Sequence, residues 1–349
     1  MSVDPNQLAC WVPIRIYWNQ RTPAVDWCWV GTRRFTEPFF DHTIDASLRL
    51  PFSMLFRPQT SIDLLRERHS IAPGLQPRGF IFHMSRCGST LASQTLSALP
   101  GSVVLSEAGP IDSVLRAQFQ DPSLSAATRI EWLRWVVSAL GQRRSGNETH
   151  LFIKFDSWSA LELPLIHQAF PGVPWVFLYR NPVEVLVSQM RKRGAHMVPG
   201  TMEPALFGMN LAEAFEMQPE QYCARVLALT CEAALRHHQS CAGLMINYEQ
   251  LPDALWTSLP GFFGIETSES DVQTFQRVAT LYAKNPSLAF ENDSQAKQNS
   301  ASEAVRQAAE RWLVPVYERL EAERARNTKG QSHGMSSYSP FQPEGLPKR

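Results

Sequence analysis

Residues 85–90 form a short polar stretch whose residue types suit phosphate binding. The stretch reads Ser-Arg-Cys-Gly-Ser-Thr and lies between the apolar run GFIFHM and the helix-like run STLASQTLSAL. Free backbone N–H groups at the start of a helix attract anions. Gly88 allows the backbone to approach a ligand closely, Ser89 and Thr90 offer hydroxyl donors, and Arg86 offers a positive charge. The stretch therefore predicts an anion site after a buried strand.

A second cation follows another apolar run. WVFLY, residues 175–179, precedes Arg180, and Asn181-Pro182 begins a predicted helix that contains Ser188. The planar guanidinium of an arginine suits a bidentate phosphate contact. Ser188 lies about two helical turns further on, so it projects toward the same side as the helix start. The alternatives are a structural salt bridge for Arg180 and an ordinary helix position for Ser188.

The nucleoside triphosphatase pattern is incomplete in this chain. That pattern requires a glycine where the chain has His83 and a lysine directly after Gly88, where it has Ser89. The strand at 175–179 ends in Arg180 instead of an acid that organises Mg²⁺. A cation there would repel Mg²⁺ and attract a phosphate, so we expect no metal at the site. Two functions are still compatible with this incomplete pattern: a P-loop small-molecule kinase and a non-catalytic nucleotide-binding protein.

Read together, the two stretches resemble the nucleotide-binding motifs of sulfotransferases that use 3′-phosphoadenosine 5′-phosphosulfate. The resemblance covers residues 79–325 and implies an enzyme that moves a sulfuryl group to an acceptor hydroxyl or amine. It implies that Arg86 stabilises the leaving group. The nucleotide-binding residues that it implies are Arg86, Cys87, Gly88, Ser89, Thr90, Arg180 and Ser188. Lys284 occupies the place of a basic loop that closes over the nucleotide in this family, although an ordinary polar loop explains residues 282–298 equally well.

Transfer to a hydroxyl requires a general base, and Glu107 is the predicted one; the alternative is that Glu107 forms a cap or pairs with a cation. It follows the apolar run SVVLS, and a carboxylate at the carboxyl edge of a parallel sheet faces the ligand crevice. His83 and His196 are rivals; His83 more readily braces the loop. Lys154 and Asp156 follow a third apolar run at the same edge, where they contact a substrate or pair with neighbouring charges. Cys87 is interpreted as a space-filling residue.

Composition limits the class of protein. The 349 residues carry no formal net charge, 44% are hydrophobic and 19% are charged, which is typical of a soluble globular protein and not of a nonspecific nucleic-acid binder. No apolar run is long enough to span a membrane. Six cysteines without a CxxC pair favour reduced thiols and a cytoplasmic location. We expect a small-molecule or peptide acceptor, and we interpret His237 and His238 as surface residues and not as metal ligands.

The order of elements predicts an α/β fold. From residue 79, apolar strands alternate with helices, which predicts a P-loop-like central parallel sheet flanked by helices over 79–325. Residues 1–70 predict a small antiparallel aromatic-rich unit. The tryptophans expected in its core are Trp11, Trp18, Trp27 and Trp29. Residues 327–349 predict a flexible tail. The loops at 108–125 and 194–217 are expected to bind the acceptor.

Overall fold

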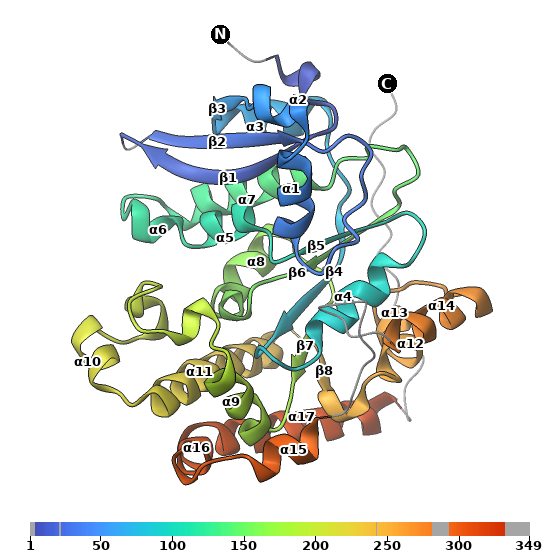
Figure 1. Ribbon diagram of the computed structural model, residues 1–349. Helices are drawn as coiled ribbons and strands as arrows, with labels where there is room; N and C mark the ends of the chain where they lie inside the picture. Colours follow the sequence, from blue (N-terminus) through green and yellow to red (C-terminus); the bar gives the residue numbers. More distant parts are fainter. Residues whose placement is uncertain (1–3, 21, 242, 281–292, 332–349) are drawn as a thin grey trace.

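The computed structural model describes residues 4–20, 22–241, 243–280 and 293–331. Its centre is a five-stranded parallel sheet with the order β5-β6-β4-β7-β8 (Figure 1). The strands are β4 (Pro77–His83), β5 (Ser102–Ser106), β6 (His150–Lys154), β7 (Trp175–Tyr179) and β8 (Leu244–Asn247). The predicted α/β fold with a central parallel sheet is therefore confirmed.

Burial explains the continuous apolar runs of these strands. Every residue of β5 and β7 is buried, as expected for a parallel sheet with both faces covered. Lys154, at the end of β6, differs from these apolar residues because its side chain is charged and yet fully buried. A buried ammonium needs a compensating partner, and that requirement shapes the carboxyl edge of the sheet.

Helices cover both faces of the sheet. The helix α4 packs against β4, β5 and β6 and is covered by α14, while η2 and α8 pack on the other side, as right-handed crossovers require (Figure 1). On the α4 side lie α4 (Ser89–Ser97), α12 (Ala254–Thr257), α13 (Leu259–Phe262) and α14 (Glu269–Ala279). The other side and its edge contain α5 (Gly109–Leu115), α6 (Ala117–Gln120), α7 (Ala126–Leu140), η2 (Ser157–Glu162), α8 (Leu163–Ala169), α9 (Pro182–Arg191) and α11 (Pro219–Ser240).

Shorter elements and the C-terminal helices complete the chain. They are η1 (Pro5–Leu8), η3 (Ala195–Met197), η4 (Pro204–Phe207), α10 (Leu211–Glu216), η5 (Tyr248–Gln250), α15 (Ser294–Asn299), α16 (Glu303–Ala308), the π-helical turn η6 (Ala309–Leu313) and α17 (Val314–Gln331). Because α17 runs to Gln331, the helix continues past residue 327, where the tail was expected to begin. Residues 332–349 lie outside the described part. None of the described helices combines the length and the apolar character required to cross a membrane.

The N-terminal segment forms a second, antiparallel sheet. It consists of β1 (Trp11–Asn19), β2 (Thr22–Trp29) and β3 (Gln59–Ser61), followed by α3 (Asp63–Ile71), with α1 (Phe40–Leu48) and α2 (Pro51–Leu55) before β3. The strand β1 packs against α5 and α7, so this sheet rests on the helices that follow β5 (Figure 1). The segment therefore borders the helix that follows β5.

The predicted tryptophan core is only partly correct. Trp27 is 1% exposed, and its indole N–H donates to Thr60 Oγ1 at 2.9 Å. The other three tryptophans are half-buried. Trp11 and Trp29 are cross-strand partners, and both contact Phe52, whose side chain is itself 45% exposed. Trp18 instead reaches Trp132 on α7, with ring centroids 6.4 Å apart.

Candidate anion-binding and catalytic site

The loop between β4 and α4 has the strand–loop–helix geometry that the sequence predicts. Ser85, Arg86 and Gly88 adopt positive φ angles of 78°, 54° and 84°. Such angles cost a non-glycine residue about 1–3 kcal/mol and persist only where surrounding contacts impose them. Glu107, at the neighbouring strand end, also has a positive φ of 55°. Three of the five non-glycine residues with positive φ among the described residues thus lie at this edge of the sheet.

Hydrogen bonds hold the strained loop in place. The backbone N–H of Ser85 donates to His83 Nδ1 at 3.0 Å, so His83 carries its proton on Nε2, which lies 3.1 Å from the carbonyl of Phe155. The buried Gln189 amide donates to Ser85 Oγ at 3.0 Å and accepts from the backbone N–H of Gly194 at 3.1 Å. The loop-bracing interpretation of His83 is confirmed by these contacts.

Cys87 and Gly88 have packing roles in the loop. The Cys87 thiol donates to the carbonyl of Leu178 at 3.1 Å, and burial raises its pKa to about 12, so it stays protonated. A Cβ on Gly88 would lie 2.5 Å from Leu251 Cδ1 and 3.3 Å from the Tyr248 ring. Glycine is therefore required here by the protein's own packing as well as by the left-handed backbone. Ser89 and Thr90 begin α4 and are buried.

Arg86 extends away from the loop. Its guanidinium donates to the carbonyl of Lys192 at 2.7 Å, in the segment directly after α9. The side chain therefore bridges the loop and that segment. A contact between Arg86 and a bound ligand would require the guanidinium to leave this carbonyl or to use its remaining donors.

Arg180 lies directly after β7 and is 4% exposed. Its Nε donates to Glu184 Oε2 at 2.6 Å, its Nη2 donates to Asp293 Oδ1 at 2.9 Å, and its guanidinium carbon lies 3.8 Å from the Tyr248 ring centroid. Asp293 also pairs with Lys297 at 2.8 Å. Without a ligand, Arg180 is neutralised by the protein's own carboxylates, as the salt-bridge alternative proposed.

The remaining predicted nucleotide contacts differ in status. Ser188 is half-buried in the last turns of α9, two turns beyond the helix start near Arg180, and its side chain makes no hydrogen bond with the described residues. Asn181 caps this helix by accepting from the N–H of Val183 at 3.0 Å. Lys284 lies outside the described residues, so its role stays a prediction.

Glu107 is held by two partners at the ends of β6 and β4. Its carboxylate forms an ion pair with the fully buried Lys154 ammonium, and Oε1 lies 3.5 Å from His83 Nε2. Burial alone would raise the pKa of Glu107, but Lys154 and His83 outweigh burial and lower this pKa well below its usual range. The predicted base is therefore a weakly basic carboxylate that compensates a buried cation.

The pKa of Asp156 is shifted in the opposite direction to that of Glu107. Burial and the nearby carboxylates of Glu107 and Asp112 raise the pKa of Asp156 well above its usual range, against the attraction of Lys154 and Arg116. The residue is half-buried and follows β6 at the carboxyl edge. A carboxylate with a raised pKa is the stronger proton acceptor once ionised. The sequence predicted the position of Asp156 at this edge. It could not predict the raised pKa, because the two carboxylates that raise it lie 44 and 49 positions earlier in the chain.

His196 lies beside this group but is enclosed. It is 6% exposed, its Nε2 lies 3.1 Å from Ser157 Oγ, and its ring contacts Trp158 with centroids 4.9 Å apart. Burial and the nearby His83 lower the pKa of His196 to about 4, so it is neutral at pH 7. The indole of Trp158 also donates to Asp112 Oδ1 at 2.7 Å, which links this histidine to the carboxylates.

One groove has a volume of about 690 Å³, large enough for a small organic molecule. Its walls come from both loops expected to bind the acceptor and from β1 of the N-terminal sheet. The lining includes Tyr17, Trp18, Arg116, Phe119, Met202 and Glu203. Arg116 pairs with Asp112, at 2.9 Å from Nε to Oδ2, and so connects the groove to the surroundings of Asp156.

No family model and no curated protein matches this sequence. Among solved structures, the chain is similar to a sulfotransferase domain from the curacin biosynthetic pathway (18% identity, 72% of this chain and 98% of that chain, TM-score 0.40). It is also similar to a sulfotransferase from Alicyclobacillus acidocaldarius (16%, 72% and 96%, 0.41) and to a mouse sulfotransferase complexed with PAP (12%, 77% and 93%, 0.39).

Glu107→Gln tests whether Glu107 compensates Lys154. The variant leaves a buried ammonium unpaired, so we expect the free energy of unfolding to fall by about 3–5 kcal/mol. Because the folded-state pKa of Glu107 is depressed, its contribution is complete above its unfolded pKa of about 4.3 and is lost as the pH falls. Urea unfolding at pH 7 and pH 4 should therefore show a larger difference between wild type and variant at pH 7.

A double variant provides the control for this prediction. Glu107→Gln combined with Lys154→Met removes both charges, so its loss of stability should be smaller than the sum of the two single losses. Additive losses would show that the two side chains do not stabilise one another.

Proposed function

We propose that this protein is a sulfotransferase that moves a sulfuryl group from 3′-phosphoadenosine 5′-phosphosulfate to an acceptor hydroxyl. The observation that carries the proposal is the position of Arg180 at the end of β7, the strand that pairs with β4. The braced loop after β4 and this arginine provide two anion-binding positions at adjacent strand ends. A nucleotide with phosphates at both its 5′ and 3′ positions needs two such positions.

The loop is assigned to the 5′ phosphosulfate. Its backbone N–H groups and the start of α4 favour negative charge, and the hydroxyls of Ser89 and Thr90 add donors. During transfer the acceptor oxygen bonds to sulfur while the bond from sulfur to the phosphate oxygen breaks, which leaves adenosine 3′,5′-bisphosphate. Arg86 is assigned to stabilising the charge on that oxygen. As a guanidinium it acts as a donor and does not release a proton.

The 3′-phosphate is assigned to Arg180, with Ser188 and Lys284 as further contacts. Phosphate binding at Arg180 would exchange Asp293 for the ligand, since both are anions that seek the same Nη2 donor. Asp293 is 45% exposed and already has a second partner in Lys297, so it can leave Arg180 without becoming an unpaired buried charge. Glu184 is buried and stays bound to Nε.

Asp156 is assigned as the general base in place of Glu107. An effective base has a pKa near the working pH, and the pKa of Glu107 is depressed while that of Asp156 is raised. The acceptor proton would pass to the Asp156 carboxylate, whose negative charge Lys154 and Arg116 stabilise. Glu107 then has the separate role of compensating Lys154.

The groove between β1 and the two loops is assigned to the acceptor. Tyr17, Trp18 and Phe119 supply aromatic surface, while Arg116 and Glu203 supply one charge of each sign. This lining suits a small molecule with an aromatic body and a free hydroxyl. The N-terminal sheet would in this way contribute to acceptor specificity.

A small-molecule kinase is the second candidate, and Asp156 is the observation that favours it. A carboxylate at the end of the strand beside the loop strand holds Mg²⁺ in P-loop nucleotide triphosphatases, and β6 pairs with β4. Against this candidate, no lysine follows Gly88, and the buried Lys154 and Arg180 place two cations where a metal would bind.

Calorimetry separates the two candidates. In EDTA, we expect adenosine 3′,5′-bisphosphate (PAP) to bind wild-type protein, and we expect Arg180→Ala to weaken binding about 10–100-fold through loss of charge-assisted hydrogen bonds. Asp293→Asn should bind several-fold more tightly because the phosphate no longer competes with a carboxylate. Arg236→Ala, an exposed arginine on α11, is the control. Binding of ATP that depends on Mg²⁺, with no binding of PAP, would support the kinase.

The pH dependence of turnover distinguishes Asp156 from Glu107. A base must be ionised, so kcat should rise with pH through the raised pKa of Asp156. If Glu107 were the base, kcat would stay flat far into the acid range. Asp156→Asn should reduce kcat about 10²–10⁴-fold and leave PAP affinity within about twofold. Unchanged turnover in this variant would refute the assignment.

Phe119→Ala tests the acceptor groove. Loss of an aromatic wall should raise the KM for a phenolic acceptor such as 2-naphthol about tenfold, as expected for roughly 1.4 kcal/mol of lost apolar contact. PAP affinity should not change, because Phe119 belongs to the groove wall. An equal loss of PAP affinity, or an unchanged KM, would place the acceptor elsewhere.

A further inference from the structure

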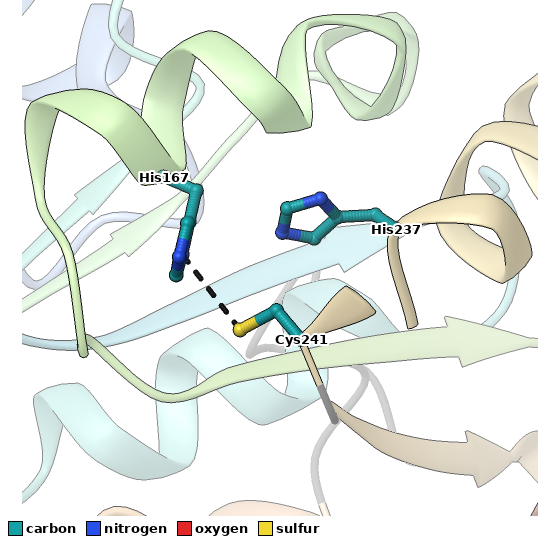
Figure 2. A group of neighbouring side chains, drawn as sticks. All are labelled: His167, His237 and Cys241. Atoms are coloured by element: carbon teal, nitrogen blue, oxygen red, sulfur yellow. Dashed lines mark hydrogen bonds between the residues drawn. The ribbon is translucent and has the colours of Figure 1, made fainter. Parts of the chain in front are cut away.

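Three potential metal ligands converge at the amino edge of the parallel sheet. His167 lies in α8 before β7, His237 lies in the last turn of α11, and Cys241 follows that helix before β8 (Figure 2). One ligand atom from each residue lies within 4.8 Å of the other two. This group is at the opposite end of the strands from Arg180 and the β4–α4 loop. It is therefore independent of the proposed sulfotransferase site.

The separations fit a shared ion. Cys241 Sγ lies 3.7 Å from His167 Nδ1, and the rings of the two histidines have centroids 5.3 Å apart. Zinc bound tetrahedrally to one sulfur and two nitrogens holds its ligand atoms about 3.3–3.6 Å apart, given the usual Zn–S and Zn–N lengths. Small side-chain rotations would bring the remaining pairs to that separation.

The environment of His237 provides a second, independent observation. Its side chain is buried at 7% exposure, and Nε2 is enclosed without a hydrogen-bond partner among the described atoms. This finding corrects the sequence-based interpretation of His237 and His238 as surface residues. His238 differs from His237, because its Nδ1 accepts from the N–H of Gly243 at 3.0 Å. A buried imidazole nitrogen without a partner is unfavourable unless something supplies one.

Trp175 contacts two of the three candidate ligands, Cys241 and His237. Trp175, the first residue of β7, donates its indole N–H to the carbonyl of Cys241 at 3.2 Å and contacts the His237 ring with centroids 5.4 Å apart. Such outer contacts orient metal ligands in known sites. They also couple the group to the start of two neighbouring strands, β7 and β8.

We propose that His167, His237 and Cys241 bind a zinc ion that ties α8, α11 and the start of β8 together. One thiolate and two imidazoles form a donor set that zinc favours. Three protein ligands leave a fourth position for water. The ion would stabilise the amino edge of the sheet and take no part in chemistry at the carboxyl edge.

Cobalt substitution tests this proposal directly. Full-length protein is treated with a chelator, dialysed and titrated with Co²⁺ and then with Zn²⁺. We expect one equivalent of Co²⁺ to produce the visible bands of a tetrahedral site and a near-ultraviolet thiolate charge-transfer band, both of which Zn²⁺ abolishes. Zinc should also raise the Tm of the metal-free protein.

Matched variants locate the ion. Cys241→Ser should remove the charge-transfer band, and His237→Gln should weaken Zn²⁺ binding at least about a hundredfold. Cys10→Ser, another half-buried cysteine, and His238→Ala are the controls and should bind as wild type. Absence of stoichiometric binding, or binding that Cys241→Ser and His237→Gln leave unchanged, would overturn the proposal. Circular dichroism of each variant checks that it has folded.

Discussion

Compensation of buried positive charge is the constraint on which the carboxyl edge of this sheet depends. Lys154 and Arg180 are almost completely enclosed at the ends of strands on either side of β4. An enclosed cation is tolerated only with a nearby anion and full hydrogen bonding. Glu107 supplies the anion for Lys154, and Glu184 with Asp293 supplies it for Arg180. The two cations differ in one respect: Asp293, a partner of Arg180, has a substantially exposed side chain.

The two ion pairs therefore differ in how easily a ligand could replace the carboxylate. The Lys154–Glu107 pair joins β5 and β6. The Lys154 side chain is fully buried, and the Glu107 side chain is 25% exposed. The Arg180–Asp293 pair joins β7 to α15 and includes a carboxylate that solvent already reaches. A phosphate can therefore replace Asp293 at lower cost than it could replace Glu107.

Local signals predicted the strands, the loop and the position of Arg180 correctly, because each depends on neighbours within one or two turns. The apolar runs specify buried strands, and Asn181 followed by Pro182 specifies the start of α9. Contacts between distant segments were not predictable in this way. Asp293 meets Arg180 across 113 positions, and Leu251 requires the glycine at position 88. The tryptophan core was overestimated because strand alternation predicts the face of a residue but not how well that face is covered.

The amino edge illustrates the same limit. His167 lies 70 positions before His237, whereas Cys241 follows His237 by only four positions, which is about one helical turn. The local chain brings His237 close to Cys241, but only the fold brings His167 to the same place (Figure 2). The two ends of the sheet thus carry different groups: enclosed cations with carboxylate partners at the carboxyl ends, and one cysteine with two imidazoles at the amino ends.

A crystal structure with PAP bound in the presence of EDTA would show whether a phosphate takes the place of Asp293 at Arg180. We expect the 5′-phosphate on the N–H groups of residues 85–90 and the 3′-phosphate on Arg180, with Asp293 withdrawn from Nη2 and Glu184 retained on Nε. We also expect Asp156 to face the open side of the 5′-phosphate. A structure in which the Arg180–Asp293 pair persists while the nucleotide binds elsewhere would contradict these expectations.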